Sequence, residues 1–219
     1  YYGIAKKDSI TSASQYIDFC KRNNLEYEIK ELDIVDSNKV DLCVKVNENL
    51  FDHEKIKKLC HEKLKKENVN IFLNQNVNEE IFSKYDFTVI CTYGNSNELL
   101  KNKKDKQLDF QFELCEKVFV KLPSNFSKKS ILILDGPFMS VEPVGTTDYF
   151  IIGDVVNTVH ETSFGKYPKF DEKFNSLLNK GIIKNPSITN YEKYIDSASQ
   201  YFPEIKNAAY VGSKKCINT

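Results

Sequence analysis

Two acidic residues flank the turn signal Gly136-Pro137 and are the nearest approach in this chain to a catalytic pair. Asp135 and Glu142 come together if the segment folds back as a tight hairpin, and paired carboxylates can supply general acid and base catalysis. Charged residues are commoner in turns than in active sites, so a surface role is the plain alternative.

The three histidines lack the spacing of metal ligands. His53 and His61 fall on one expected helix, His160 lies far along the chain, and neither His-x-x-x-His nor Glu-x-x-His spacing occurs. We therefore expect no metal site, and we expect the helix histidines to be solvated.

Composition narrows the class of protein. The net charge is zero, with 31 basic and 31 acidic residues, which argues against non-specific nucleic-acid binding. The six cysteines form no Cys-x-x-Cys pair, which favours reduced core thiols. No apolar run approaches the length of a membrane span and no signal-peptide pattern occurs, so we expect a cytoplasmic protein.

The elements that must position any site begin with the stretch Phe112 to Asp154. Apolar residues alternate there, as at Val118 and Val120, and Gly-Pro and Gly-Thr turn signals separate strand-length pieces. This pattern predicts an antiparallel meander.

The preceding region has a different pattern. Val40 to Val46 alternates as a strand, Asp52 can cap a helix to about Glu67, and Val69 to Leu73 and the apolar run Phe87 to Thr92 read as further strands. Strand, helix and buried strand in this order predict a βαβ-like arrangement, so the fold class is mixed α/β.

The flanking segments supply the remaining expected elements. They are a strand at Tyr1 to Lys6, a helix capped by Asp8 or Ser9, a strand at Leu25 to Leu32, helices at Phe170 to Lys180 and Thr189 to Tyr201, and a strand at Ala208 to Ile217.

No Gly-x-Gly-x-x-Gly or Walker-type loop occurs. The nearest feature is Tyr93-Gly94 after the apolar run, because a glycine at the carboxyl end of a buried strand lets a ligand approach the backbone. A glycine needed only for the turn is the alternative.

Several of these pieces follow a familiar order. Val69-Asn-Ile-Phe-Leu-Asn-Gln-Asn-Val77 after a helix, then Tyr85-Asp-Phe-Thr-Val-Ile-Cys-Thr-Tyr-Gly94, resembles FAD-dependent oxidoreductases of the D-amino-acid oxidase and glycine oxidase superfamily. Phe112 to Gly153 resembles the substrate-domain sheet of that family. Tyr201-Phe-Pro-Glu-Ile followed by Tyr210-Val-Gly-Ser resembles the return to the FAD domain.

The resemblance implies FAD as cofactor and assigns residues to it. Val77 would contact the adenine end through its backbone, and Thr92, Tyr93 and Gly94 would lie along the dinucleotide. Phe138 and Tyr149 would line the substrate pocket. The flavin would take a hydride from a small amine or amino acid, while the protein positions the substrate and no side-chain acid or base is demanded.

Three departures qualify what the resemblance implies. The amino-terminal dinucleotide loop and the carboxyl-terminal FAD-closing segment have no counterpart, so a central fragment is expected. The arginine that binds a substrate carboxylate has no match either, and only Lys214 and Lys215 stand nearby, which lack its planar fork.

The expected division of the chain follows the resemblance. Residues 1–39 are a substrate-domain segment, 40–105 part of the FAD-binding lobe, 106–206 the substrate-binding domain, and 207–219 the return to the FAD lobe. The alternative reading is a non-catalytic α/β module that binds a ligand or partner without a cofactor. A weaker third reading is an enzyme of another class that uses Asp135 and Glu142.

Overall fold

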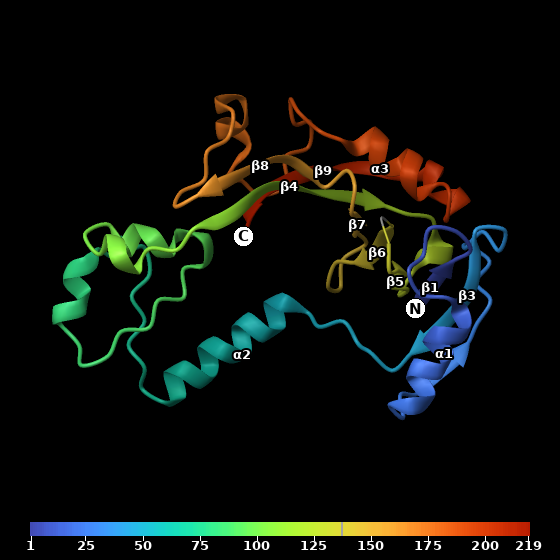
Figure 1. Ribbon diagram of the computed structural model, residues 1–219, viewed down its shortest axis with the longest axis horizontal. Coiled ribbons are helices and arrows are strands. Elements are labelled where there is room, and N and C mark those ends of the chain that lie inside the picture. The colour runs from blue at the N-terminus through green and yellow to red at the C-terminus, as the bar shows by residue number, and fades with distance from the viewer. Residues whose placement is uncertain (137) are drawn as a thin grey trace.

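The computed structural model describes residues 1–136 and 138–219 and builds them around one nine-stranded, mostly antiparallel sheet (Figure 1). The strands are β1 (Tyr2–Ala5), β2 (Tyr27–Ile29), β3 (Val40–Val46), β4 (Phe110–Lys121), β5 (Ile131–Leu134), β6 (Met139–Pro143), β7 (Phe150–Asp154), β8 (Val159–Gly165) and β9 (Ala209–Asn218). The α-helices are α1 (Ala13–Arg22), α2 (His53–Lys66) and α3 (Tyr191–Ala198). Short 3-10 helices are η1 (Glu79–Ser83), η2 (Tyr93–Leu100), η3 (Lys104–Lys106), η4 (Ser124–Phe126), η5 (Glu172–Leu177) and η6 (Pro203–Asn207). The predicted mixed α/β class is confirmed.

The strand order is β2-β3-β1-β5-β6-β7-β4-β8, with β9 pairing the other side of β4. β5, β6 and β7 follow one another as antiparallel neighbours, which confirms the predicted meander in that part. β4 does not pair with β5; it pairs with β7, and β5 instead lies parallel to β1. The sheet therefore draws strands from all four segments of the expected domain division, and the division itself stays a prediction.

The main core lies between this sheet and α3. On β4 the residues Phe112, Leu114, Val118 and Val120 are buried on one face, as the alternation of side chains along a strand requires. Tyr194 and Ala198 of α3 are buried in the main core, and Tyr191 and Ile195 are partly buried against it. Figure 1 shows α3 running along one side of β4 and β9.

The helix α1 covers the other end of the sheet near β1 and β3. Its N-cap is Ser12, not Asp8 or Ser9, and Ser12 and Gln15 form a reciprocal capping box. Ala13 and Ile17 pack against the cluster that contains Ile4 and Val44, so α1 presents an apolar face to the sheet from its first turn onward.

The βαβ-like arrangement predicted for Val40 to Gly94 does not form. β3 pairs antiparallel with β1 and β2, and neither Val69 to Leu73 nor Phe87 to Thr92 is a strand. The prediction was wrong because an apolar pattern indicates only a preference for burial. A strand also needs a neighbouring strand that pairs with its backbone. No such neighbour lies beside these segments in the part of the chain that the structure describes.

The helix α2 begins at the predicted cap, Asp52, but no residue of α2 is buried. Its apolar residues Ile56, Leu59 and Leu64 are exposed, and so is most of the chain up to Phe87. Figure 1 shows the α2 ribbon apart from the sheet, on the side opposite α3.

The predicted helix Phe170 to Lys180 is shorter than expected. Only the 3-10 helix η5 forms there, and Phe174 and Leu177 are buried against Leu114 as the apolar spacing indicated. The four remaining predictions for the flanking segments are confirmed with shifted bounds, as β1, β2, α3 and β9.

Candidate functional site

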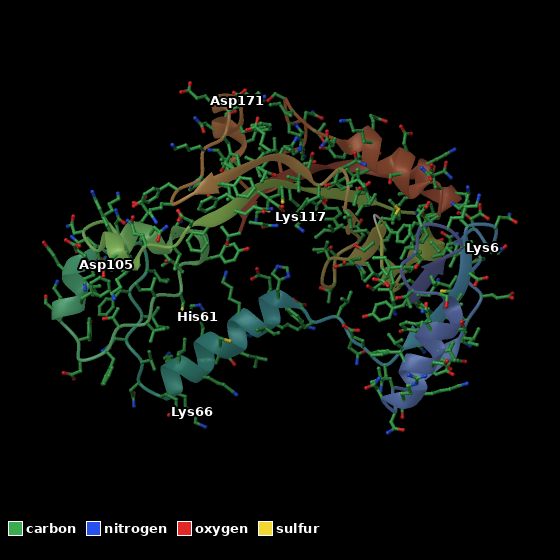
Figure 2. All side chains as sticks on the ribbon, in the orientation of Figure 1. Lys6, His61, Lys66, Asp105, Lys117 and Asp171 are labelled. Atoms are coloured by element: carbon green, nitrogen blue, oxygen red, sulfur yellow. The ribbon has the colours of Figure 1, made fainter. Side chains whose placement is uncertain are left out.

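A buried carboxylate lies at the centre of the sheet, at a position where the strand pattern places an apolar residue. Glu116 shares the inward face of β4 with Leu114 and Val118 and is 1% exposed. Figure 2 shows the next residue, Lys117, on the side of β4 away from α3. A buried charge is costly unless it is paired and hydrogen-bonded, so its partners define the site.

Four groups from three other segments meet this carboxylate. The Thr189 hydroxyl donates to Oε1 at 2.6 Å, and the Asn190 backbone N–H donates to Oε2 at 2.8 Å. His160 Nε2 lies 2.8 Å from Oε2, and Lys215 Nζ lies 3.0 Å from Oε1. Glu116 therefore joins β4, β8, β9 and the turn before α3.

These contacts set the protonation of the pair. Burial alone raises the pKa of Glu116, but hydrogen bonds from His160, Ser213, Thr189 and the Asn190 backbone outweigh it and hold that pKa below the ordinary value. Burial lowers the pKa of Lys215, and the Glu116 carboxylate opposes that shift. Both carboxylate oxygens of Glu116 already accept hydrogen bonds, so this residue acts as an anchor and not as a free base.

Lys215 connects this cluster to a cavity of about 690 Å³ at the edge of β9. Lys215 is 2% exposed, and its Nζ has no hydrogen-bond partner of acceptable geometry despite the short distance to Glu116. An ammonium group carries three donors, so unused donors remain there. The cavity is lined by Thr92–Asn95, Phe112, Pro168, Leu178–Gly181 and Lys214–Ile217.

The lining is positively charged. It contains Lys180, Lys214 and Lys215 and no acidic residue. The cavity therefore suits a ligand with negative charge.

Tyr93, which also lines the cavity, has a backbone φ of 52°. This left-handed conformation is uncommon for a bulky residue and often marks a functional position.

The cavity brings together three residues that the resemblance assigned to FAD, namely Thr92, Tyr93 and Gly94. They form the start of η2, and the Tyr93 hydroxyl donates to the carbonyl of Thr219 at 2.8 Å. The space beside Gly94 is occupied, because an added Cβ would lie 2.9 Å from a methyl group of Thr219 and 3.3 Å from the Phe112 ring. This glycine therefore allows close packing of the protein on itself.

The other predicted residues lie elsewhere. Val77 is exposed in the irregular segment between α2 and η1. Phe138 is buried, contacts the Tyr201 ring edge-on at 5.7 Å, and lines a separate cavity of about 270 Å³. Tyr149 lies in the turn before β7, where Lys121 Nζ is 5.4 Å from its ring. The structure does not bring Val77, Phe138 and Tyr149 to the cavity at β9, and their binding roles stay predictions.

The carboxylates Asp135 and Glu142 do not form a pair. In the β5–β6 hairpin Ile131 is opposite Val141, so Glu142 lies at the far end from Asp135, about 17 Å away at the usual rise per residue. Asp135 accepts a hydrogen bond from Thr11 instead. The segment folds back as expected, but the register separates the two side chains.

The buried cluster was missed by sequence reasoning, although a signal was present. Glu116 is the one charged residue in the series Phe112, Leu114, Glu116, Val118, Val120, which otherwise reads as a buried face. Nothing local marks Thr189 or His160 as its partners, because both reach it through tertiary contacts. His53 and His61, by contrast, are exposed on α2, as the solvated alternative predicted. Figure 2 shows His61 on this helix.

A scan against protein-family models and a search of curated proteins each found no match for this chain. Within residues 1–136 and 138–219, no three His, Cys, Asp or Glu side chains gather as metal ligands would. None of the helices in the described chain has the length and apolar character that crossing a bilayer requires.

Proposed function

We propose that this chain is part of an FAD-dependent oxidoreductase that oxidises a small amine or amino acid by hydride transfer to flavin. The observation that supports it best is the meeting of Thr92, Tyr93 and Gly94 with the last strand of the sheet around a cationic cavity. These are the two parts of the chain that the resemblance assigns to the cofactor lobe and to the return from the substrate domain.

The residues present fit only the anionic part of such a cofactor. Lys180 and Lys214 are exposed in the cavity lining and can contact a phosphate or carboxylate as point charges. No glycine-rich loop that would hold a pyrophosphate occurs in the sequence, and the space at Gly94 is filled by Thr219 and Phe112. A bound flavin would supply the redox chemistry, and the residues of this chain would bind and orient its charged groups.

The proposal is tested by titrating the purified protein with FAD and following flavin fluorescence. We expect saturable quenching, and we expect Gly181→Leu to weaken binding at least about tenfold, because an added side chain there meets open space in the cavity. Lys184→Leu is the matched control, since Lys184 is exposed on the same loop but outside the lining. Absence of any FAD binding, or equal affinity for the Gly181 variant and the wild type, would contradict the proposal.

A non-catalytic binding module without a cofactor is the second candidate. Two observations favour it: Gly94 packs against protein instead of leaving room for a ligand, and both carboxylate oxygens of Glu116 already accept hydrogen bonds from the protein. A protein that binds no FAD but binds a peptide in the cavity at β9 would support this candidate.

We further propose a cytoplasmic location and a small-molecule substrate. All six cysteines are free thiols, which suits a reducing compartment. The balanced charge gives no general attraction for nucleic acid.

A further inference from the structure

The helix α2 carries a stripe of apolar side chains that the rest of the protein does not cover. Ile56, Leu59, Cys60 and Leu64 follow the spacing i, i+3, i+4 and i+8, which places them on one face of an α-helix. All four residues are exposed, and Ile56 and Leu59 are 43% and 56% exposed. A surface helix normally buries such an apolar stripe against the core, so this one is available to a partner outside the chain.

The turn after α2 continues the apolar surface past the end of the helix. The Asn68 N–H donates to the Lys65 carbonyl at 3.1 Å, and the Val69 N–H donates to the Leu64 carbonyl at 2.9 Å. These bonds form a Schellman motif, with Asn68 in the left-handed conformation at a φ of 54°. The exposed side chains of Val69 and Phe72 follow directly, so they lengthen the apolar surface that the helix begins.

The remainder of α2 is strongly basic. Between His53 and Lys66 the helix has six lysines and two glutamates, although the whole chain has no net charge. Among the described residues, three of these lysines lie near a carboxylate, each at 3.9 Å, and Lys63, Lys65 and Lys66 form no ion pair. The helix therefore presents uncompensated positive charge beside its apolar stripe.

Lysines stand at both borders of the apolar stripe. On a helical wheel at roughly 100° per residue, Lys66 lies about 20° beyond Leu59 at one border, and Lys57 about 20° beyond Leu64 at the other. The two glutamates lie about 60° or more from the stripe by the same reckoning. A helix in a bilayer interface needs this order, because its apolar face enters the acyl boundary while the bordering cations reach the lipid headgroups.

We propose that α2 binds the surface of a bilayer that contains anionic phospholipid and lies parallel to the plane of that surface. The apolar stripe enters the boundary between headgroups and acyl chains, and Lys57 and Lys66 contact lipid phosphates as point charges. The sheet stays in water, because α2 stands apart from it (Figure 1). The inference does not depend on the flavin proposal.

Lys63 favours a bilayer over an apolar groove of a partner protein. On the same wheel it falls inside the stripe, between Leu59 and Ile56. A groove that enclosed the stripe would bury the ammonium group of Lys63, which is costly unless the groove also supplies a counter-charge. At a bilayer the long side chain can lie along the apolar surface and keep its charge among the headgroups.

The first measurement is cosedimentation of the full chain with lipid vesicles. One set is phosphatidylcholine alone, and in the other roughly one third of the lipid is phosphatidylserine. We expect saturable binding to the second set, at least about tenfold weaker binding to the first, and loss of binding in high salt. Equal binding to both sets, or to neither, overturns the proposal. Binding of soluble polyglutamate without binding of vesicles would assign the face to an acidic protein and overturns it too.

The second measurement locates the contact with two variants of α2. Ile56→Ser removes an apolar side chain and Lys66→Glu reverses a bordering charge, so each should weaken binding to the anionic vesicles at least about tenfold. Ile10→Ser and Lys21→Glu are the matched controls, because they make the same changes at exposed positions outside α2. The controls should change the affinity by less than about twofold. Equal effects of the α2 variants and their controls overturn the proposal.

Cys60 gives an independent readout on the wild type. It is an exposed thiol within the stripe, and Cys91 is an exposed thiol outside α2. Anionic vesicles should slow the reaction of Cys60 with a polar maleimide about threefold or more, while Cys91 reacts as before. Peptide mass spectrometry follows the two thiols separately. Unchanged labelling of Cys60 overturns the proposal, and so does slowing of Cys60 by higher protein concentration without lipid, because a second copy would then cover the stripe.

Discussion

At the scale of single residues, the molecule depends on an ion pair buried in the sheet. Glu116 and Lys215 are directly opposite each other on β4 and β9, and both side chains are almost fully buried. A buried pair of this kind contributes little compared with apolar residues, but removal of one partner leaves the other charge uncompensated. The two side chains should therefore tolerate joint replacement far better than single replacement.

We expect Glu116→Gln to lower the free energy of unfolding by about 3 kcal/mol or more at pH 7, because Lys215 loses its counter-charge. The double variant Glu116→Gln with Lys215→Met should recover most of that loss. Urea unfolding measures both, and Glu113→Gln on the same strand is the control with a partly exposed carboxylate. Equal losses in the single and double variants would show that the pair is not coupled.

The same pair predicts a pH dependence. The folded-state pKa of Glu116 lies below its ordinary value, so its stabilisation is present above about pH 4.3 and is lost as pH falls below that value. Burial lowers the pKa of Lys215, so the cost of its charge is relieved only as pH rises past its folded-state pKa. Both effects make stability increase with pH, and the double variant should lose less stability in acid than the wild type.

At the scale of elements, two capped helices differ in their contacts with the core. The Ser12 hydroxyl accepts from Gln15 N at 3.2 Å at the start of α1, whose Cys20 is buried. Asp52 accepts from Glu54 N at 3.1 Å at the start of α2, which buries nothing. Local propensity and caps therefore formed both helices, but only α1 gains from tertiary packing.

We expect Ser12→Ala to lower the global free energy of unfolding by about 1 kcal/mol. Asp52→Ala should speed hydrogen exchange in α2 and leave the global unfolding midpoint unchanged, because α2 can unfold without opening the core. Urea unfolding and residue-resolved hydrogen exchange distinguish the two effects. A similar midpoint shift for both variants would mean that α2 is coupled to the sheet.

The elements also show why some predictions succeeded. Period-two patterns in Val40 to Val46 and in Phe112 to Asp154 predicted strands correctly, since one face of each is buried in the sheet. The equally apolar Val69 to Leu73 is not a strand. Pattern encodes a preference for burial, but the pairing partner of a strand is a tertiary property.

At the scale of the whole molecule, the region between β3 and β4 is fastened to the sheet at few points. Asn97 is its one fully buried residue, and its Nδ2 donates to the carbonyls of Leu108 and Lys166, both at 2.8 Å. Residues 53–78, by contrast, are exposed throughout. Cooperative stability should therefore reside in the sheet and α3.

We expect limited proteolysis to cut first within residues 67–78, because exposed irregular chain is the preferred substrate of proteases. The two products should remain together on size-exclusion chromatography, since β1 pairs with β5 across the cut. Mass spectrometry locates the cut. A first cleavage inside β4, or separation of the products without denaturant, would contradict this view.

The sequence by itself determined the mixed α/β class, the alternating strands, the cap of α2 and the absence of metal-ligand spacing, because these depend on residue type and local periodicity. It pointed to Tyr93 and Gly94 through a glycine turn after an apolar run, and to Thr92 only through resemblance. The tertiary structure decided the strand order, the wide separation of Asp135 and Glu142, and the convergence of His160, Thr189 and Lys215 on Glu116. Pairing and register depend on contacts between residues far apart in the chain, which no local pattern encodes.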